Sequence, residues 1–389
     1  MELDDDEDLA QAVTWEELEA TLKWFSKDKS PRPDGWTVEF FISFFEVIGS
    51  DLLSVVEKSR TSGRLEAAIT STFIALIPKI DKPSTFDDFC PISLCNCLYK
   101  IIAKNIANRV KPILSKHILP KQFAFLKDRQ IYEAIGMAQE VSHTLHCKRG
   151  KGMIMKVDLS KAFDRVNWLY LRILLNHLGF PFSFIKWIMG CISNIPFNVL
   201  VNGSATHFFT SARGLRQGCP LSPFLFLLVM EGFSRIISED HRWGRLKGIN
   251  IMENCILTDL LFVDNVLVFL SGSVGDITSI RNIFSLFQKA TGMLINEGKS
   301  TLTVSTCSQQ EINYVLDRFH FMKLELVEGL KYLGYKLKPN GYKIADWTWL
   351  IAKLEKRLSI RYLSFFYLAQ ADQHSLRVSW KQRSSIGCP

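Results

Sequence analysis

The sequence predicts an α+β fold, in which an antiparallel sheet packs against helices. Two apolar runs meet at Val263-Asp264-Asn265, which predicts a β-hairpin from Ile256 to Leu270, because Asp and Asn accept the positive φ of tight turns. Asn202-Gly203, also between apolar runs, predicts a second hairpin. Stretches with helical periodicity separate these strands, so we expect helices on one face of the sheet.

Composition limits the possible classes of protein. The chain has 389 residues, of which 47% are hydrophobic, enough for a sizeable core. Its nine cysteines show no repeated spacing, which predicts reduced thiols in an intracellular protein. No signal peptide and no apolar run of about 20 residues is found, so we expect no membrane segment. The formal net charge is +8, although six of the first eight residues are acidic. The basic remainder favours a polyanionic partner, with a merely soluble basic surface as the alternative.

The N-terminal part predicts helices followed by a strand. Thr14–Glu17 resembles a capping box, and Ser30–Gly35 contains the prolines and glycine of a loop. Helical periodicity resumes through Phe40–Leu53, and Phe73–Ile77 has the composition of a strand. Tyr99–Ser115 then predicts an amphipathic helix. Its basic flank is either a solvated face or the wall of a groove for phosphates, and it contains Lys100, Lys104, Arg109 and Lys111.

The central and C-terminal parts continue the alternation of strands and helices. Met153–Val157 predicts a strand that ends at Asp158, and Asn167 is expected to cap a helix that stops at Gly179. Arg213–Ser222 predicts a loop that leads into an apolar helix over 223–237. Asp276 is expected to cap a further helix that ends at Gly292.

Two acidic positions carry the chemical hypothesis. Asp158 lies at a predicted strand end and Asp264 at a hairpin tip, and neither has a His or Cys partner nearby in the sequence. Carboxylates without such partners suit Mg²⁺, and two such ions can hold the attacking and leaving oxygens of nucleotidyl transfer. The alternatives are an ordinary acidic turn at Asp264 and a simple helix-capping role for Asp158.

A series of motifs resembles the reverse transcriptase domain of non-long-terminal-repeat (LINE-type) retrotransposons, particularly those abundant in plant genomes. The resemblance extends from Thr14 to Leu337, and its motifs occur in the family's order. They are Ser30–Gly35, Leu76–Lys79, Asp88–Asn96, Ala107–Pro112, Gln122–Phe125, Arg129–Ile131, Val157–Asp164, Arg213–Pro223, Phe262–Asn265, Gly292–Lys299 and Tyr332–Gly334.

This resemblance implies a right-hand polymerase with fingers, palm and a truncated thumb. It implies RNA-directed DNA synthesis by two-metal nucleotidyl transfer, with Mg²⁺ or Mn²⁺ as cofactor. The expected partners are an RNA template, a DNA primer and deoxynucleoside triphosphates, in the nucleus. The implied domains are an N-terminal helical extension (1–69), fingers and palm (70–340), and a diverged thumb remnant (341–389). We expect neither an endonuclease before the domain nor a ribonuclease H after it.

The resemblance also gives roles to individual residues. Asp158 and Asp264 are the expected metal ligands, and Lys299 is a candidate general acid. Phe163 is expected to stack under the sugar, with a core Phe as the alternative. The full catalytic set is Asp158, Asp264, Asn265 and Lys299; the nucleotide-binding set is Lys79, Phe163, Arg213, Arg216 and Gln217; the primer grip is Tyr332, Leu333 and Gly334.

Two departures from the family pattern predict an impaired or inactive site. The family's hairpin tip carries two adjacent aspartates, whereas the second position here is Asn265, a neutral amide. Cys90 stands where the family has an arginine directed at the nucleotide, and a thiol cannot supply a forked cation. The alternative functions are a non-catalytic nucleic-acid-binding remnant or the product of a decayed element with no activity.

Overall fold

The structure is a computed structural model that describes residues 9–26, 34–201, 204–253 and 255–358. Residues up to Pro339 form one compact unit, and those from Asn340 form a second. Within the second unit, η4 spans Ile344–Asp346 and residues 348–358 are helical. Parts of two predicted turns, at 30–33 and 202–203, and most of the predicted thumb remnant lie outside the described residues. The division at 69 and 340 stays a prediction.

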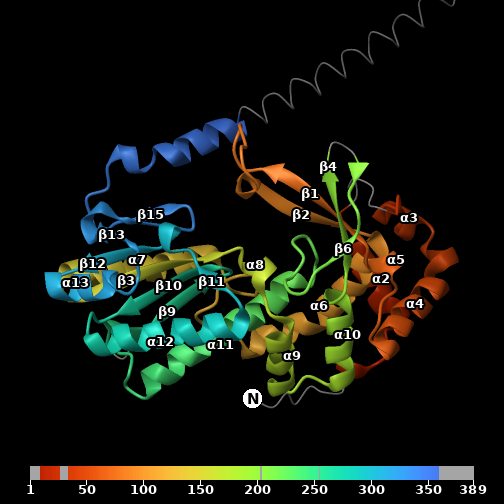
Figure 1. The fold of residues 1–389 in the computed structure, drawn as a ribbon, viewed down its shortest axis with the longest axis horizontal. Helices are drawn as coiled ribbons and strands as arrows, with labels where there is room; N and C mark the ends of the chain where they lie inside the picture. Colours follow the sequence, from red (N-terminus) through yellow and green to blue (C-terminus); the bar gives the residue numbers. More distant parts are fainter. Residues whose placement is uncertain (1–8, 27–33, 202–203, 254, 359–389) are drawn as a thin grey trace, which may run out of the picture. The chain divides into compact units, whose positions relative to one another are not determined.

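The central sheet of the first unit has six strands in the order β13-β12-β3-β10-β9, with β11 paired to β3 (Figure 1). All pairs are antiparallel except β12 with β13. The predicted strand before Asp158 is confirmed as part of β3. The strands are β3 (Gly152–Ser160), β9 (Asp259–Phe262), β10 (Asn265–Leu270), β11 (Leu294–Ile295), β12 (Thr301–Ser305) and β13 (Met322–Glu325).

Helices cover both faces of this sheet, so the expectation of helices on one face is wrong. Met155 and neighbouring alternate side chains of β3 pack in the core that includes α11 (Ser222–Arg242) and α12 (Val274–Thr291). Ile154 points to the opposite face, into a smaller core with α7 (Ile131–Cys147). Figure 1 shows α11 and α12 together along one side of the sheet. The middle of β3 is therefore apolar at consecutive positions, which hides the alternation that one buried face produces.

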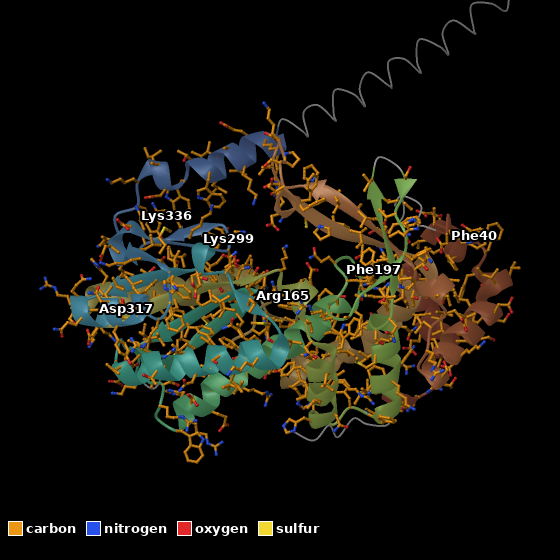
Figure 2. All side chains as sticks on the ribbon, viewed as in Figure 1. Phe40, Arg165, Phe197, Lys299, Asp317 and Lys336 are labelled. Atoms are coloured by element: carbon orange, nitrogen blue, oxygen red, sulfur yellow. The ribbon has the colours of Figure 1, made fainter. Side chains whose placement is uncertain are left out.

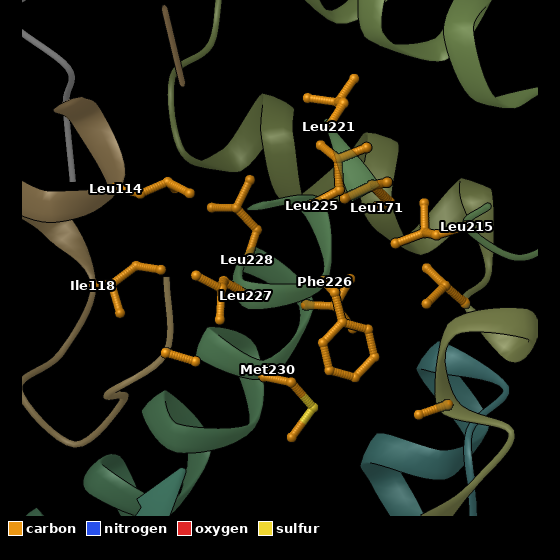
Figure 3. Close-up of a cluster of buried hydrophobic side chains, with 14 of the residues drawn as sticks. Leu114, Ile118, Leu171, Leu215, Leu221, Leu225, Phe226, Leu227, Leu228 and Met230 are labelled. Atoms are coloured by element: carbon orange, nitrogen blue, oxygen red, sulfur yellow. The ribbon is translucent and has the colours of Figure 1, made fainter. Parts of the chain in front are cut away.

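The α11 helix is the centre of the larger core. Consecutive residues from Leu225 to Met230 are all buried, so this part of the helix is apolar around its whole circumference. Figure 3 shows Leu227 and Leu228 of α11 near Leu114 of α6 (Cys97–His117). The predicted apolar helix over 223–237 is thus confirmed, with a longer C-terminal end.

A second sheet of five strands has the order β2-β1-β4-β5, with β6 paired to β4 (Figure 1). The strand predicted at Phe73–Ile77 is confirmed as β1, and it runs antiparallel to β2 and parallel to β4. The bounds are β1 (Thr72–Pro78), β2 (Phe89–Cys95), β4 (Pro196–Val201), β5 (Ser204–Ala205) and β6 (Phe209–Thr210). A 3₁₀ turn, η1 (Phe86–Asp88), leads into β2.

The remaining elements are helices, 3₁₀ turns and two further hairpins. The helices are α2 (Trp15–Lys23), α3 (Val38–Ser43), α4 (Phe45–Ser62), α5 (Ala67–Thr70), α8 (Ala162–Arg165), α9 (Trp168–His177), α10 (Phe182–Ile192) and α13 (Gln309–Leu316), with 3₁₀ turns η2 (Glu297–Lys299) and η3 (Leu326–Glu328). The hairpins are β7 (Ile249–Met252) with β8 (Cys255–Leu257), and β14 (Leu330–Tyr332) with β15 (Tyr335–Leu337). No helix in the described ranges is both long and apolar enough to cross a bilayer.

Several predicted helix ends are confirmed and one is wrong. The Thr14 hydroxyl accepts a hydrogen bond from the Glu17 backbone N–H, and Asn167 caps α9 in the same way. The helix expected over Phe40–Leu53 is divided between α3 and α4. Ser273, and not Asp276, caps α12. The Asp276 carboxylate lies buried and accepts backbone N–H groups from preceding loops instead.

The basic flank of α6 is directed largely at the protein itself. The Arg109 guanidinium binds the Glu17 carboxylate through two nitrogens and donates to the backbone oxygens of Leu9 and Gln11. The Lys104 ammonium lies over the Trp24 ring, 3.3 Å from its centroid. These two cations hold the N-terminal segment against α6, so the groove-wall interpretation does not apply to them.

We expect Arg109→Ala to destabilise the protein by about 2–4 kcal/mol, because it leaves a half-buried carboxylate and several carbonyls without their donor. Chemical denaturation would measure the loss, and hydrogen exchange would show deprotection over residues 9–23. Lys111→Ala, at an exposed position of the same helix, is the matched control and should change stability by less than about 0.5 kcal/mol. Equal losses of stability in the two variants would contradict the proposal that Arg109 holds the N-terminal segment against α6.

Candidate active site

The β9–β10 hairpin and strand β3 bring the two predicted acidic residues to the same end of the central sheet. The hairpin is confirmed, and its turn consists of Val263 and Asp264, because Phe262 pairs with Asn265. On its other side β10 pairs with β3, and Asn265 lies directly opposite Asp158. Residues opposite each other in an antiparallel pair have Cβ atoms about 4.5–5.5 Å apart. The sheet register therefore fixes Asp158, Asp264 and Asn265 as neighbours.

The turn reaches its shape through an unexpected residue. Val263 has a φ of +57°, whereas Asp264 and Asn265 do not adopt positive φ. The expectation that Asp and Asn supply the positive φ is therefore wrong. A β-branched residue is strained in this region of backbone space, and such strain is concentrated at functional sites. In this turn Val263, whose backbone is left-handed, directly precedes Asp264.

Burial raises the pKa of Asp264, and the charge of nearby Asp158 raises it further. The Asn265 side-chain amide donates a hydrogen bond of 3.2 Å to the Asp264 carboxylate. A neutral amide at this position thus relieves a repulsion that a third carboxylate would increase. A carboxylate whose pKa is raised by burial and by a neighbouring acid, as at Asp264, is typical of a functional site.

The end of β3 is held by the segment that carries Lys299. The Asp158 backbone oxygen accepts from the Asn296 N–H at 2.8 Å, and the Asp158 N–H donates to the Ser300 hydroxyl at 3.1 Å. Ile295 of β11 pairs with Leu159. Lys299 is therefore connected to Asp158 through a short, hydrogen-bonded loop.

A cleft of about 710 Å³ lies between the ends of these strands and the β1–β2 hairpin. Five of the sequence-predicted positions line it: Lys79, Asp158, Gln217, Asp264 and Lys299. Figure 2 labels Lys299 and another basic residue of the lining, Arg165. The remaining lining residues are Leu76, Phe86, Asp87, Phe89, Cys90, Pro91, Leu159, Ser160, Lys161, Asp164, Arg165 and Asn296. The cleft thus places carboxylates and lysines around one space.

Gln217 and Cys90 meet on the side of the cleft formed by β2. The Cys90 thiol lies 3.7 Å from the Gln217 side-chain oxygen, and the Gln217 amide donates to the Asp164 carboxylate at 3.3 Å. Burial raises the pKa of Asp164. The loop before Gln217 needs glycine at Gly214, where φ is +96° and a Cβ would come within 2.7 Å of the Asp164 backbone oxygen.

Of the two arginines in this loop that the sequence predicts to bind the nucleotide, one is buried and the other is exposed. The Arg216 guanidinium is buried, donates to the Thr72 hydroxyl and the Cys191 backbone oxygen, and lies over the Tyr99 ring. Every one of these contacts is internal to the protein, and Arg216 does not line the cleft, so its role in nucleotide binding stays a prediction. Arg213 is exposed and lines a neighbouring pocket rather than the cleft.

Phe163 and the predicted primer grip lie outside the cleft lining. The Phe163 ring is half-buried and stacks on Phe226 with centroids 4.4 Å apart, as the alternative of a core Phe expects. Leu333 and Gly334 form a two-residue turn between β14 and β15, with φ of +47° and +89°. Tyr332 is fully buried in the smaller core, so only the turn itself can face a ligand.

Sequence reasoning overlooked Lys161, Asp164 and Asp87 as cleft residues. Lys161 and Asp164 belong to the Val157–Asp164 motif, so that motif contained a signal for them. Asp87 stands in a turn-rich stretch, and no local pattern distinguishes it there from an ordinary solvated acid. Its position depends on how the β1–β2 hairpin folds over the sheet.

Comparison with known protein families identifies the family to which this chain belongs. The reverse transcriptase (RNA-dependent DNA polymerase) family profile matches residues 77–337, about two thirds of the chain. The chain belongs to the reverse transcriptase family. Reverse transcriptases generally use divalent metal ions and act on nucleic acid templates with deoxynucleoside triphosphates. The α+β fold of this domain therefore corresponds to the palm and fingers of a polymerase, with the cleft between them.

Two of the relatives described here carry the names of mobile elements. The chain is 27% identical over 343 residues to the transposon TX1 149 kDa protein of Xenopus laevis, covering 87% of this chain and 25% of the relative. It is 27% identical over 337 residues to the Pol polyprotein of the type-2 retrotransposable element R2DM of Drosophila melanogaster, covering 85% and 30%. An Arabidopsis thaliana mitochondrial protein, AtMg01250, is 42% identical over 67 residues, covering 17% and 55%. The resemblance to non-long-terminal-repeat retrotransposon reverse transcriptases is confirmed, and the chain spans about a quarter to a third of the first two relatives.

We expect Asp264→Asn to stabilise the metal-free protein at neutral pH. The pKa of Asp264 is raised in the folded state, so the wild type loses stability as the pH rises from about 4 through that raised value. The variant lacks this titration. Thermal unfolding in a chelator should show similar stability at pH 3 and a gain for the variant at pH 7, roughly 0.5–2 kcal/mol, a range typical of substitutions that relieve functional strain. Asp317→Asn, an acid far from the cleft lining, is the control, and a loss of stability in Asp264→Asn would contradict the burial argument.

Proposed function

We propose that this domain catalyses RNA-templated DNA synthesis, adding deoxynucleotides to a primer 3′-hydroxyl with release of pyrophosphate. The observation that carries the proposal is the pairing register that places Asp158 beside Asp264 at the floor of a lysine-lined cleft. Family membership supports the reaction class, because the matched range of residues 77–337 includes these acids and lysines.

Asp158 and Asp264 fit a divalent cation in charge and in ligand type. Both offer oxygen ligands, and burial together with the charge of Asp158 raises the pKa of Asp264. In the described ranges no cluster of three or more His, Cys, Asp or Glu residues is placed to hold a metal. The proposed ligands are the two acids together with water and substrate oxygens. Bound Mg²⁺ or Mn²⁺ would supply the positive charge that nucleotidyl transfer requires.

We assign roles to the other predicted residues from their positions inside or outside the cleft. Lys79 and Lys299 both line the cleft; their proposed role is to bind the phosphates of the incoming nucleotide, with Lys299 giving a proton to the leaving pyrophosphate. Gln217 lies against the nucleotide, oriented by its hydrogen bond to Asp164. Outside the cleft lining, the proposed roles are a limit on the space at the sugar for Phe163, a contact at the margin for Arg213, and a primer contact for the Leu333–Gly334 turn next to Tyr332.

We further propose that Asn265 and Cys90 reduce the present activity. Asn265 leaves two carboxylates where the family has three, which lowers the affinity for divalent ions and the stabilisation of charge in the transition state. Cys90 lines the cleft beside Gln217 without a positive charge. The order of the motifs supports an origin in a plant LINE-type element, whose reaction on chromosomal DNA would occur in the nucleus.

Primer extension tests the activity directly. Purified protein with Mg²⁺ or Mn²⁺, a homopolymer RNA template and a DNA primer should extend the primer slowly, and Asp158→Ala should abolish the extension. Lys151→Ala, which removes an exposed lysine outside the cleft, should retain it. Extension that is equal in the wild type and in Asp158→Ala would exclude this site as its source.

Restoring the family residues should raise the rate. We expect Asn265→Asp to increase extension by about 10²–10³-fold, the typical effect of one preorganised electrostatic group, and Asn265→Asp with Cys90→Arg to increase it further. The metal concentration for half-maximal activity should fall as well. Asn265→Gln keeps an amide and serves as the control. A double variant no faster than the wild type would show that the impairment lies elsewhere.

A further inference from the structure

Lys161 is a cleft residue without a role in the reaction described above. It lies between Asp158 and Asp164 in chain order and directly follows the end of β3. Its φ of +48° is left-handed, a conformation that costs a non-glycine residue free energy. The cleft lining includes its side chain together with Lys79 and Lys299.

Asp87 contacts both lysines at the mouth of the cleft. The Lys161 ammonium lies 2.9 Å from the Asp87 carboxylate, and the Lys79 ammonium donates to the Asp87 backbone oxygen, also at 2.9 Å. The Lys161 ammonium holds the pKa of the Asp87 carboxyl below its usual value. Asp87, a residue of η1, therefore contacts two lysines. Lys79 directly follows β1 and Lys161 directly follows β3, and these two strands belong to different sheets.

The Lys161–Asp87 pair contributes little to folding where it lies. The two side chains are 63% and 79% exposed, and exposed ion pairs add little net stability. A triphosphate carries more negative charge than one carboxylate and offers more acceptor oxygens to an ammonium group. It can therefore compete successfully for Lys161 and Lys79 once it enters the cleft.

We propose that Lys161 binds the triphosphate of the incoming nucleotide, and that Asp87 is its internal counter-ion, displaced when the nucleotide enters. This inference rests on the proposed polymerase function and adds a binding residue and a competitor to it. Lys161 is then bound by Asp87 in the empty cleft and by phosphate oxygens in the filled one. Asp87 thereby sets the affinity for nucleotides, because each binding event first breaks its pair with Lys161.

Opposite effects of two neutralising substitutions test this exchange. Isothermal titration calorimetry of the full chain with Mg²⁺ would measure binding of deoxythymidine triphosphate and of inorganic tripolyphosphate. Lys161→Gln should weaken both by about tenfold or more, since it removes a charge-assisted contact. Asp87→Asn should tighten both by about two- to fivefold, because it frees the lysine.

The controls separate this inference from the proposed function. Lys23→Gln breaks another exposed ion pair, with Glu19, and should leave both affinities unchanged. If the wild type binds both probes but Lys161→Gln binds equally well, or if Asp87→Asn weakens binding as Lys161→Gln does, the inference is wrong and the polymerase proposal stands. A wild type that binds neither probe overturns both.

Discussion

The pairing of β3 with β10 is the constraint on which the site depends. One register places Asn265 opposite Asp158 and leaves Asp264 in the adjoining turn. A slip of one residue would turn every side chain of β10 to the other face and separate the acids. Both faces of this sheet are buried, in a larger core with α11 and α12 and a smaller one with α7. The cores therefore specify the register, and the register positions the acids.

The strand pairing that brings the two acids together also lowers the stability of the folded protein at the site. Asp158 and Asp264 repel each other in a half-buried position, and Val263 holds a left-handed backbone that a β-branched residue disfavours. Asn265 relieves part of this repulsion, with its amide donating to Asp264. The aspartate expected there would restore the repulsion and the third metal ligand together. At this position a more stable turn and a better metal site require different residues.

The sequence was sufficient for elements whose pattern is local. The strand before Asp158, the hairpin around Asp264 and the helices that follow Asn167 and Arg213–Ser222 all carry periodicity or turn chemistry that one segment alone specifies. It was insufficient for the direction of charged side chains. Arg216 and Arg109 read as candidates for a polyanion, yet both bind backbone oxygens of distant segments. A positive charge in the sequence does not reveal which carbonyls the fold will bring to it, and the cleft position of Asp87 depended in the same way on tertiary structure.

The ion pair between Arg109 and Glu17 also affects how the chain folds during synthesis. Its partners are separated by 92 residues, so α2 leaves the ribosome long before α6 is available to receive it. At roughly 5–20 residues per second this delay is about 5–20 s. Leu18 and Leu22, which are buried in the folded protein, lack the packing that α6 supplies during that interval, although α3 and α4, which also contact α2, are already available. The packing of α2 against α6 therefore cannot be completed until Arg109 has emerged.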